Sequence, residues 1–116
     1  MAQGIRVALR PLSSLVVIDL QGEMTTFAED AVNAAYREAS EQHAQDVLLN
    51  FSGVDYLNSA GIAIVIGLLT EARKSDRRLM VTGLTPHYQK IFRMMGLSRY
   101  IPMFDSEELA RQSVAP

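Results

Sequence analysis

The sequence predicts an α/β domain with a mixed, mostly parallel sheet of four to five strands, an antiparallel N-terminal strand, and helices packed on the sheet. Short apolar runs of strand length alternate along the chain with segments of helical period, as in β-α-β units. Only a short turn separates the first two runs, and strands joined so closely pair antiparallel. The chain of 116 residues contains no linker or repeat. We therefore expect residues 1–116 to form one domain with a core of about residues 4–112.

The strands follow from runs of apolar residues. Ile5, Val7 and Leu9 alternate with Arg6 and Ala8, which is typical of a half-buried strand. A turn is expected after this strand. Three further runs are nearly all apolar, as in strands that helices cover on both faces. The turn spans residues 11–14, and the three runs span residues 15–20, 47–51 and 79–82.

The first two helices follow from capping and spacing. Thr26, followed three residues later by Glu29, forms a capping box that predicts the start of the first helix. Small apolar residues then recur at helical spacing and form a narrow face that can lie close to a sheet. These residues are Ala28, Ala31, Val32, Ala35 and Ala39. Residues 52–58 are predicted to form a loop that leads into an apolar helix over about residues 59–75.

Two more helices are expected near the C-terminus. Thr85 and Pro86 form the N-cap and first-position pair of a helix start, and Gly96 suits the position just after its end. Asp105 and Glu108 are predicted to cap a last short helix. The inner stripe of the longer helix is expected to consist of Tyr88, Ile91, Phe92 and Met95.

The loops that follow parallel strands are expected to share one edge of the sheet. Right-handed crossovers bring these loops together, and open α/β sheets bind their partners at that edge. The three loops predicted to meet there are residues 22–26, 52–58 and 83–86. We expect the functional site at this edge.

Composition and charge argue against several classes of function. The net charge of −2 argues against nucleic acid as the main partner, which calls for a basic patch. Cys is absent, and neither His43 nor His87 has a carboxylate or second His at ligand spacing, so we expect no metal or other cofactor and no catalytic activity. The longest apolar run, residues 60–69, is about half of the ~20 residues that span a bilayer. We therefore expect a cytoplasmic protein that does not insert into a membrane.

The most informative segment, residues 55–62, opens the apolar helix. Asn58 and Ser59 are both good N-cap residues, because each side chain can accept a hydrogen bond from a free backbone N–H. From the spacing alone, two interpretations of Ser59 stay open. It is either a helix cap or a functional serine at the tip of the helix.

The apolar helix contains more apolar residues than one face requires. Plotted at about 100° per residue, one set of residues forms a face predicted to cover the sheet, and Ile64 and Leu68 then point away from it. The covering face consists of Ile62, Val65, Ile66 and Leu69. The surplus residues either pack on a neighbouring helix or form an exposed patch for a partner. A homodimer also stays open, because an apolar helix can pair with itself.

Three segments, taken in order, resemble one known family. Residues 22–25 (Gly-Glu-Met-Thr) are similar to its Gly-Glu-Leu-Asp, and residues 57–62 (Leu-Asn-Ser-Ala-Gly-Ile) to its Met-Asp-Ser-Ser/Thr-Gly-Leu. Residues 84–97 are similar to its third helix and the turn that follows. The family is the STAS domain, named for sulfate transporters and anti-sigma factor antagonists, and the resemblance covers nearly the whole chain. The family usually has Asp where this chain has Thr25 and Asn58.

The resemblance implies a STAS-like fold and the function of an anti-sigma factor antagonist without catalytic activity. It implies that Ser59 is the phosphoacceptor of a partner serine kinase that is also an anti-sigma factor. The unmodified form then binds the kinase and frees a sigma factor, phosphorylation breaks the complex, and a serine phosphatase restores it. The residues predicted to bind the partner are Glu23, Thr25, Asn58, Ala60, Gly61, Ile64 and Leu68.

A second function stays open beside this switch. A STAS domain can serve as a constitutive adaptor, either in a stress-signalling scaffold or as the soluble subunit of a membrane transport complex. The uncharged Thr25 and Asn58 favour this alternative, because two carboxylates that the family usually has beside the serine are missing.

Overall fold

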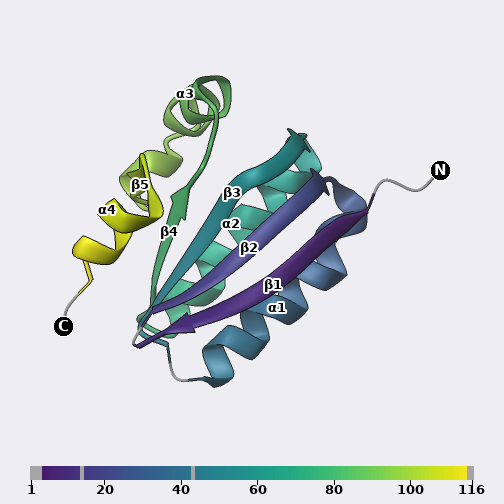
Figure 1. The fold of residues 1–116 in the computed structure, drawn as a ribbon. Coiled ribbons are helices and arrows are strands. Elements are labelled where there is room, and N and C mark those ends of the chain that lie inside the picture. The colour runs from purple at the N-terminus through teal and green to yellow at the C-terminus, as the bar shows by residue number, and fades with distance from the viewer. Residues whose placement is uncertain (1–3, 14, 43, 115–116) are drawn as a thin grey trace.

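The computed structural model describes residues 4–13, 15–42 and 44–114. Five strands form one sheet in the order β1-β2-β3-β4-β5 (Figure 1). β1 and β2 pair antiparallel, and the other neighbours pair parallel. The predicted fold class is therefore confirmed. The strands are β1 (Ile5–Leu12), β2 (Leu15–Met24), β3 (Asp46–Leu57), β4 (Arg78–Thr82) and β5 (Met103–Phe104).

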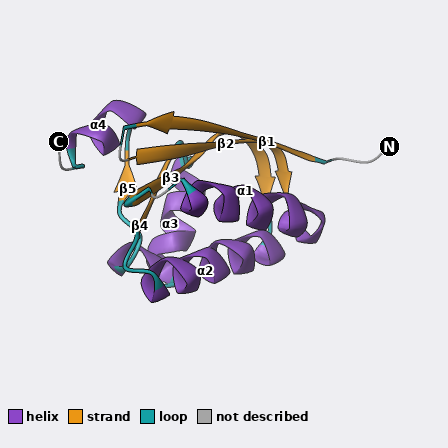
Figure 2. Ribbon diagram, turned by 90° about the horizontal axis from the view of Figure 1, so that it is seen from below, coloured by secondary structure: helices purple, strands orange, loops and turns teal. Residues whose placement is uncertain are grey.

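Helices cover both faces of the sheet unequally. Helices α1 and α2 lie side by side on one face, whereas the short helix α4 lies on the other (Figure 2). The large apolar core fills the space between the sheet, α1 and α2. A small second cluster lies under α4 and contains Leu15, Val17, Leu48, Met80 and Ala110. The helical elements are η1 (Thr26–Ala28), α1 (Glu29–Glu41), α2 (Ser59–Lys74), α3 (Pro86–Met94), η2 (Leu97–Arg99) and α4 (Glu107–Gln112).

The paired strands β2 and β3 extend further than the sequence predicts. β3 continues to Leu57, so the loop expected over residues 52–58 is wrong apart from Asn58. β2 runs beside it to Met24, and the pair absorbs two register irregularities, one of them next to Gly22 with φ 109°. The polar, glycine-containing part of β3 stays extended because β2 supplies its hydrogen-bond partners. Both strands therefore end next to the start of α2.

The first turn and the first helix also differ from the prediction. The turn expected at residues 11–14 is shorter than predicted, because β1 reaches Leu12 and only Ser13, with φ 60°, is described as a turn. Ser14 and His43 lie outside the described residues. Thr26 opens η1 instead of capping α1, and α1 begins three residues later without a side-chain cap. The capping box is therefore wrong. Ala31, predicted to lie on the inner face of this helix, is exposed, while the rest of that set is buried.

The predicted start and end of α3 are confirmed. The Thr85 side chain caps the helix, and Gly96 follows it with φ 78°, in the left-handed region that favours glycine. Phe92 is fully buried, as the predicted inner stripe requires. Met95 is 51% exposed and does not belong to that stripe, because it follows the last helical residue.

An ion-pair network fixes α4 to the sheet. Its N-cap is Ser106, whose backbone is extended, and not the predicted Asp105. The guanidinium of Arg10 on β1 donates to Asp19 on β2 (2.5 Å) and to Glu107 on α4 (2.6 Å). Hydrogen bonds from Arg10 hold the pKa of both carboxyls below their ordinary values. The network therefore joins β1, β2 and α4 on the face opposite α1 and α2.

Candidate functional site

Of the three segments predicted to meet at one sheet edge, residues 22–26 and 52–58 are joined by backbone contacts, and a side chain of α3, which begins within residues 83–86, reaches the same edge. Met24 at the end of β2 pairs with Leu57 at the end of β3. The backbone N–H of Asn58 donates to the Met24 carbonyl (3.4 Å). The Leu57 N–H donates to the hydroxyl of Tyr88 (3.1 Å), which α3 brings to this edge. The start of α2 is therefore held from both sides.

Ser59 is the first residue of α2 and is exposed. The cap is Asn58: its side-chain oxygen accepts from the Gly61 N–H (3.0 Å), and its carbonyl accepts from the Ile62 N–H (2.9 Å). The interpretation of Ser59 as the cap is therefore wrong. Within the described residues its hydroxyl makes no hydrogen bond. The chain thus displays a free serine hydroxyl at a helix N-terminus.

The residues around Ser59 hold the helix tip in place. Gly61 is buried against β2, where an added Cβ would overlap the carbonyl oxygen of Met24. The side chain of Thr25 accepts from the Phe27 N–H (3.3 Å) and so fixes the turn that passes beside this tip. Gly61 therefore positions the site and offers no side chain to a partner. The partly exposed members of the predicted set are Glu23, Thr25, Asn58 and Ala60.

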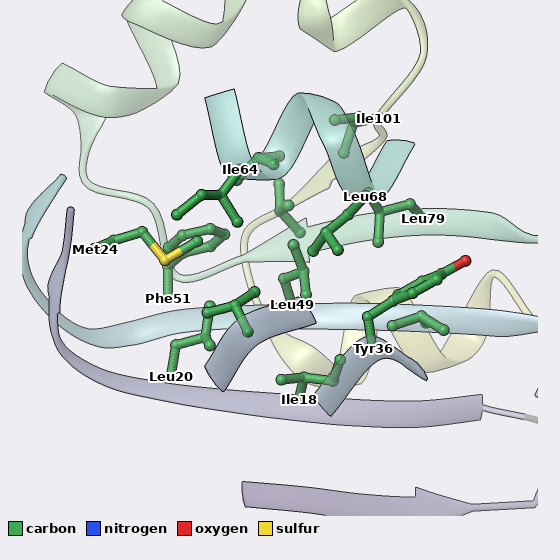
Figure 3. Close-up of a cluster of buried hydrophobic side chains, with 14 of the residues drawn as sticks. Ile18, Leu20, Met24, Tyr36, Leu49, Phe51, Ile64, Leu68, Leu79 and Ile101 are labelled. Carbon is green, nitrogen blue, oxygen red and sulfur yellow. The ribbon is translucent and has the colours of Figure 1, made fainter. Parts of the chain in front are cut away.

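The exposed apolar patch, one of the two alternatives left open for Ile64 and Leu68, is wrong. These side chains are only 6% and 1% exposed, and both belong to the core (Figure 3). They are buried because α2 packs against α1 as well as against the sheet, so its buried face is centred nearer to α1 than predicted. The alternative that they pack on a neighbouring helix is confirmed. Ile66, predicted to cover the sheet, is 37% exposed instead, and Leu69 is partly exposed.

Two aromatic residues at this edge were missed. Phe27 is 87% exposed in η1, which packs against α2, and Tyr56 is 47% exposed on β3, where it pairs with Glu23. A signal for Phe27 was present, because the residue falls outside the small apolar face of the first helix. No comparable signal marks Tyr56, since the sequence predicts a loop over residues 52–58. The edge therefore carries exposed apolar surface beside a free hydroxyl.

Among the described residues no group of three or more His, Asp or Glu side chains could hold a metal ion. In the same part of the chain, none of the helices is both long and apolar enough to cross a membrane.

The fold and this edge define a class of protein. The family model of the STAS domain matches residues 6–110, so the chain belongs to the STAS domain family. Its resemblance to that family is therefore confirmed.

Individual relatives carry the name of anti-sigma factor antagonists. The anti-sigma F factor antagonist of Paenibacillus polymyxa is 18% identical over 104 residues, which span 89% of each chain. The crystal structure of an anti-sigma factor antagonist from Mycobacterium paratuberculosis superimposes with a TM-score of 0.82 and 18% identity, covering 95% of this chain and 93% of that one. The Bacillus cell fate determinant SpoIIAA in its phosphorylated form gives a TM-score of 0.72 and 24% identity, covering 94% and 100%. At these identities the structural similarity shows the fold alone.

Proposed function

We propose that this protein is an anti-sigma factor antagonist that acts by binding and is switched by phosphorylation of Ser59. The observation that carries the proposal is the exposed Ser59 hydroxyl, which is free because Asn58 caps the helix. Relatives over nearly the whole chain are named for this activity, and SpoIIAA has been solved in a phosphorylated form. The unmodified protein binds an anti-sigma factor and frees the sigma factor.

A phosphate on Ser59 is compatible with the fold. Phosphorylation adds about −1.5 to −2 charges at pH 7. The first N–H groups of a helix have no intrahelical acceptor. Here Asn58 accepts from Gly61 and Ile62, which leaves the N–H groups of Ser59 and Ala60 open towards an anion. The folded protein therefore tolerates the modification.

A docked partner does not tolerate it. Phe27 is exposed in η1, which packs against α2, and Tyr56 is exposed three residues before Ser59. In the proposed complex the partner covers these aromatic rings and also removes water from Ser59. Desolvating an unpaired phosphate costs several kcal/mol. A hundredfold loss of affinity requires only about 2.7 kcal/mol. Phosphorylation of Ser59 thus prevents binding without changing the fold.

The partner we propose is a serine kinase that is also the anti-sigma factor. The chain needs no catalytic base next to Ser59, because the kinase supplies the groups that position and activate the hydroxyl. A serine phosphatase completes the cycle by restoring the free hydroxyl. Such a cycle operates in the cytoplasm, where sigma factors act, so we assign the protein to that compartment.

The first test is whether Ser59 carries phosphate in the cell. Protein from its native source, grown with and without stress, is analysed by intact mass and by phosphosite mapping. We expect a phosphate adduct on Ser59 in one condition and its absence in the other. A chain that is unmodified in all conditions yet still bound to its partner would point to the constitutive adaptor instead.

The second test measures binding with matched variants. The anti-sigma factor that co-purifies with the wild-type protein from its native source should bind the wild type and Ser59→Ala equally, and Ser59→Asp at least about a hundredfold more weakly. The control is Ser98→Asp, which places the same charge on an exposed serine of η2 and should bind like the wild type. Phe27→Ala should weaken binding by about tenfold or more, as loss of a buried aromatic anchor does. Equal binding by Ser59→Asp and Ser59→Ala would remove Ser59 from the mechanism.

A further inference from the structure

Close to Ser59, β3 has a neighbouring strand on only one side. β2 pairs with it as far as Leu57, whereas its pairing with β4 ends where Asn50 meets Thr82. Residues 52–56 are exposed or partly exposed, so water can solvate their backbone groups on the open side. Leu57 is only 4% exposed, and a buried backbone N–H needs an acceptor within the protein. The end of β3 therefore requires an acceptor from outside the sheet.

The hydroxyl of Tyr88 is that acceptor, and α3 holds it in place. It accepts from the Leu57 N–H at 3.1 Å. The Thr85 hydroxyl accepts from the N–H of Tyr88 (3.3 Å), and Pro86 begins the helix, so the backbone of Tyr88 lies in a capped first turn. The aromatic ring is partly buried and packs against the main core. The hydroxyl is therefore held at the end of β3 by a residue 31 positions further along the chain.

Core packing alone does not explain this hydroxyl. The inner stripe of α3 calls for an apolar side chain, and the ring of a phenylalanine would pack against the core as the ring of Tyr88 does. A tyrosine hydroxyl that is withdrawn from water usually has a hydrogen-bond partner, and here that partner is the backbone of another element. The hydroxyl therefore serves the end of β3, two residues before Ser59.

The bond to Tyr88 bears directly on the position of Ser59. Only Asn58 lies between Leu57 and Ser59. The Asn58 N–H donates to the Met24 carbonyl, but at 3.4 Å this bond is long for an N–H···O contact. The bonds by which Asn58 caps α2 lie within the helix tip and move with it. Of the two N–H groups that precede Ser59, the one bound to Tyr88 therefore forms the shorter bond to the rest of the protein.

We propose that Tyr88 is a positioning residue for Ser59 in the phosphorylation switch, an inference that rests on the proposed function. In that reaction the Ser59 oxygen attacks the γ-phosphorus of ATP bound to the kinase, its proton passes to a base of the kinase, and the bond from the phosphorus to ADP breaks. Such a transfer requires the attacking oxygen to be placed in line, and a misplacement of about 1 Å lowers the rate by about a hundredfold. Tyr88 acts on this placement through Leu57, and not on the phosphate.

The first measurement needs no partner. Amide hydrogen exchange, followed by NMR on the full chain, compares the wild type with Tyr88→Phe, which keeps the ring and removes only the acceptor. The Leu57 amide should exchange about tenfold faster relative to the Leu49 amide of the same strand, because it has lost its hydrogen bond. Tyr100→Phe, which removes the hydroxyl of an exposed tyrosine, should exchange like the wild type. An unchanged ratio in Tyr88→Phe would show that the hydroxyl is not the acceptor and would overturn the proposal.

The second measurement is the steady-state phosphorylation of Ser59 by the kinase that co-purifies with the wild-type protein. Tyr88→Phe should lower kcat about tenfold and leave KM within about twofold of the wild type, because the docking surface is intact and only the placement of the hydroxyl is disturbed. The control is Ile91→Val, which removes one methylene from a partly buried position on the same helix. It should lower the melting temperature, as Tyr88→Phe does, but leave kcat unchanged.

The outcomes separate this inference from the proposed function. If wild-type Ser59 is phosphorylated and Tyr88→Phe keeps the wild-type kcat, Tyr88 only supports the fold and the inference is wrong. The same holds if Ile91→Val lowers kcat as much as Tyr88→Phe, because loss of stability would then explain both effects. If the kinase transfers no phosphate to wild-type Ser59, the proposed function itself is wrong, and the inference falls with it.

Discussion

Gly61 and Gly67 lie on the same helix and form a matched pair in which alanine should have opposite effects. An added Cβ at Gly67 meets nothing within 4 Å, so the substitution gains only helix propensity. The helix propensity of alanine is more favourable than that of glycine by about 0.8 kcal/mol in a helix interior, so Gly67→Ala should stabilise the protein by that amount. At Gly61 the same atom overlaps the backbone of Met24 and lies 2.7 Å from a methyl carbon of Leu57.

The overlap at Gly61 outweighs the gain in helix propensity. The Met24 carbonyl belongs to β2 and cannot rotate away, so the first turn of α2 has to move off the sheet. Overpacking of this kind costs about 1–3 kcal/mol. The movement also strains the hydrogen bond from Asn58 to Met24, worth about 1 kcal/mol. After subtracting about 0.8 kcal/mol for helix propensity, Gly61→Ala should destabilise the protein by about 1–3 kcal/mol.

Urea unfolding followed by far-UV circular dichroism measures both variants. Their free energies of unfolding should differ by about 2–4 kcal/mol with unchanged dependence on urea. A urea unfolding curve of Gly61→Ala that matches the wild type would refute the close packing of α2 on β2. So would equal stabilisation by the two substitutions, because helix propensity would then be the only effect.

Two further predictions concern the core and the ion-pair network. Leu68→Asp should lose at least about 4 kcal/mol of stability, because it buries an unpaired charge. Ile66→Asp, on the exposed side of α2, should lose less than about 1 kcal/mol. Thermal melts measure both variants, and similar losses would contradict the assigned faces of the helix. Because Arg10 lowers the pKa of Glu107 in the folded state, the pair contributes stability at neutral pH that is lost as the pH falls below the ordinary glutamate value of 4.5. On acidification from pH 6 to about pH 3, the melting temperature of Glu107→Gln should therefore fall less than that of the wild type. If the two melting temperatures fell in parallel, the ion pair would contribute nothing to stability.

Local patterns predicted the elements that local forces determine. Residues 15–20, 47–51 and 79–82 are nearly all apolar, and such runs are stable mainly as buried strands. Thr85 and Gly96 delimit α3 through hydrogen bonds and backbone angles that involve only neighbouring residues. The extension of β3 depends on pairing with β2, more than 30 residues earlier in the chain, so its polar composition concealed it.

The buried face of α2 illustrates a limit of periodicity. The helix is apolar around most of its circumference, so the pattern shows which residues can be buried but not which of them are. That choice depends on α1, which packs beside α2 and covers Ile64 and Leu68. The site has the same ambiguity on a smaller scale, since Asn58 and Ser59 are equally good caps. The extended backbone of Asn58 (φ −107°, ψ −175°) makes it the cap and leaves Ser59 free.

The uncharged caps beside Ser59 bear on how the proposed switch works. Asn58 supplies an amide oxygen to the Gly61 N–H, as an aspartate would, but without a negative charge. Thr25 caps the neighbouring turn with an equally neutral hydroxyl. A phosphate on Ser59 therefore meets no carboxylate in either cap, so the two caps add no like-charge repulsion to the modified, folded state. In the proposed switch, the effect of phosphorylation therefore falls on the partner that covers Phe27 and Tyr56, and not on the fold.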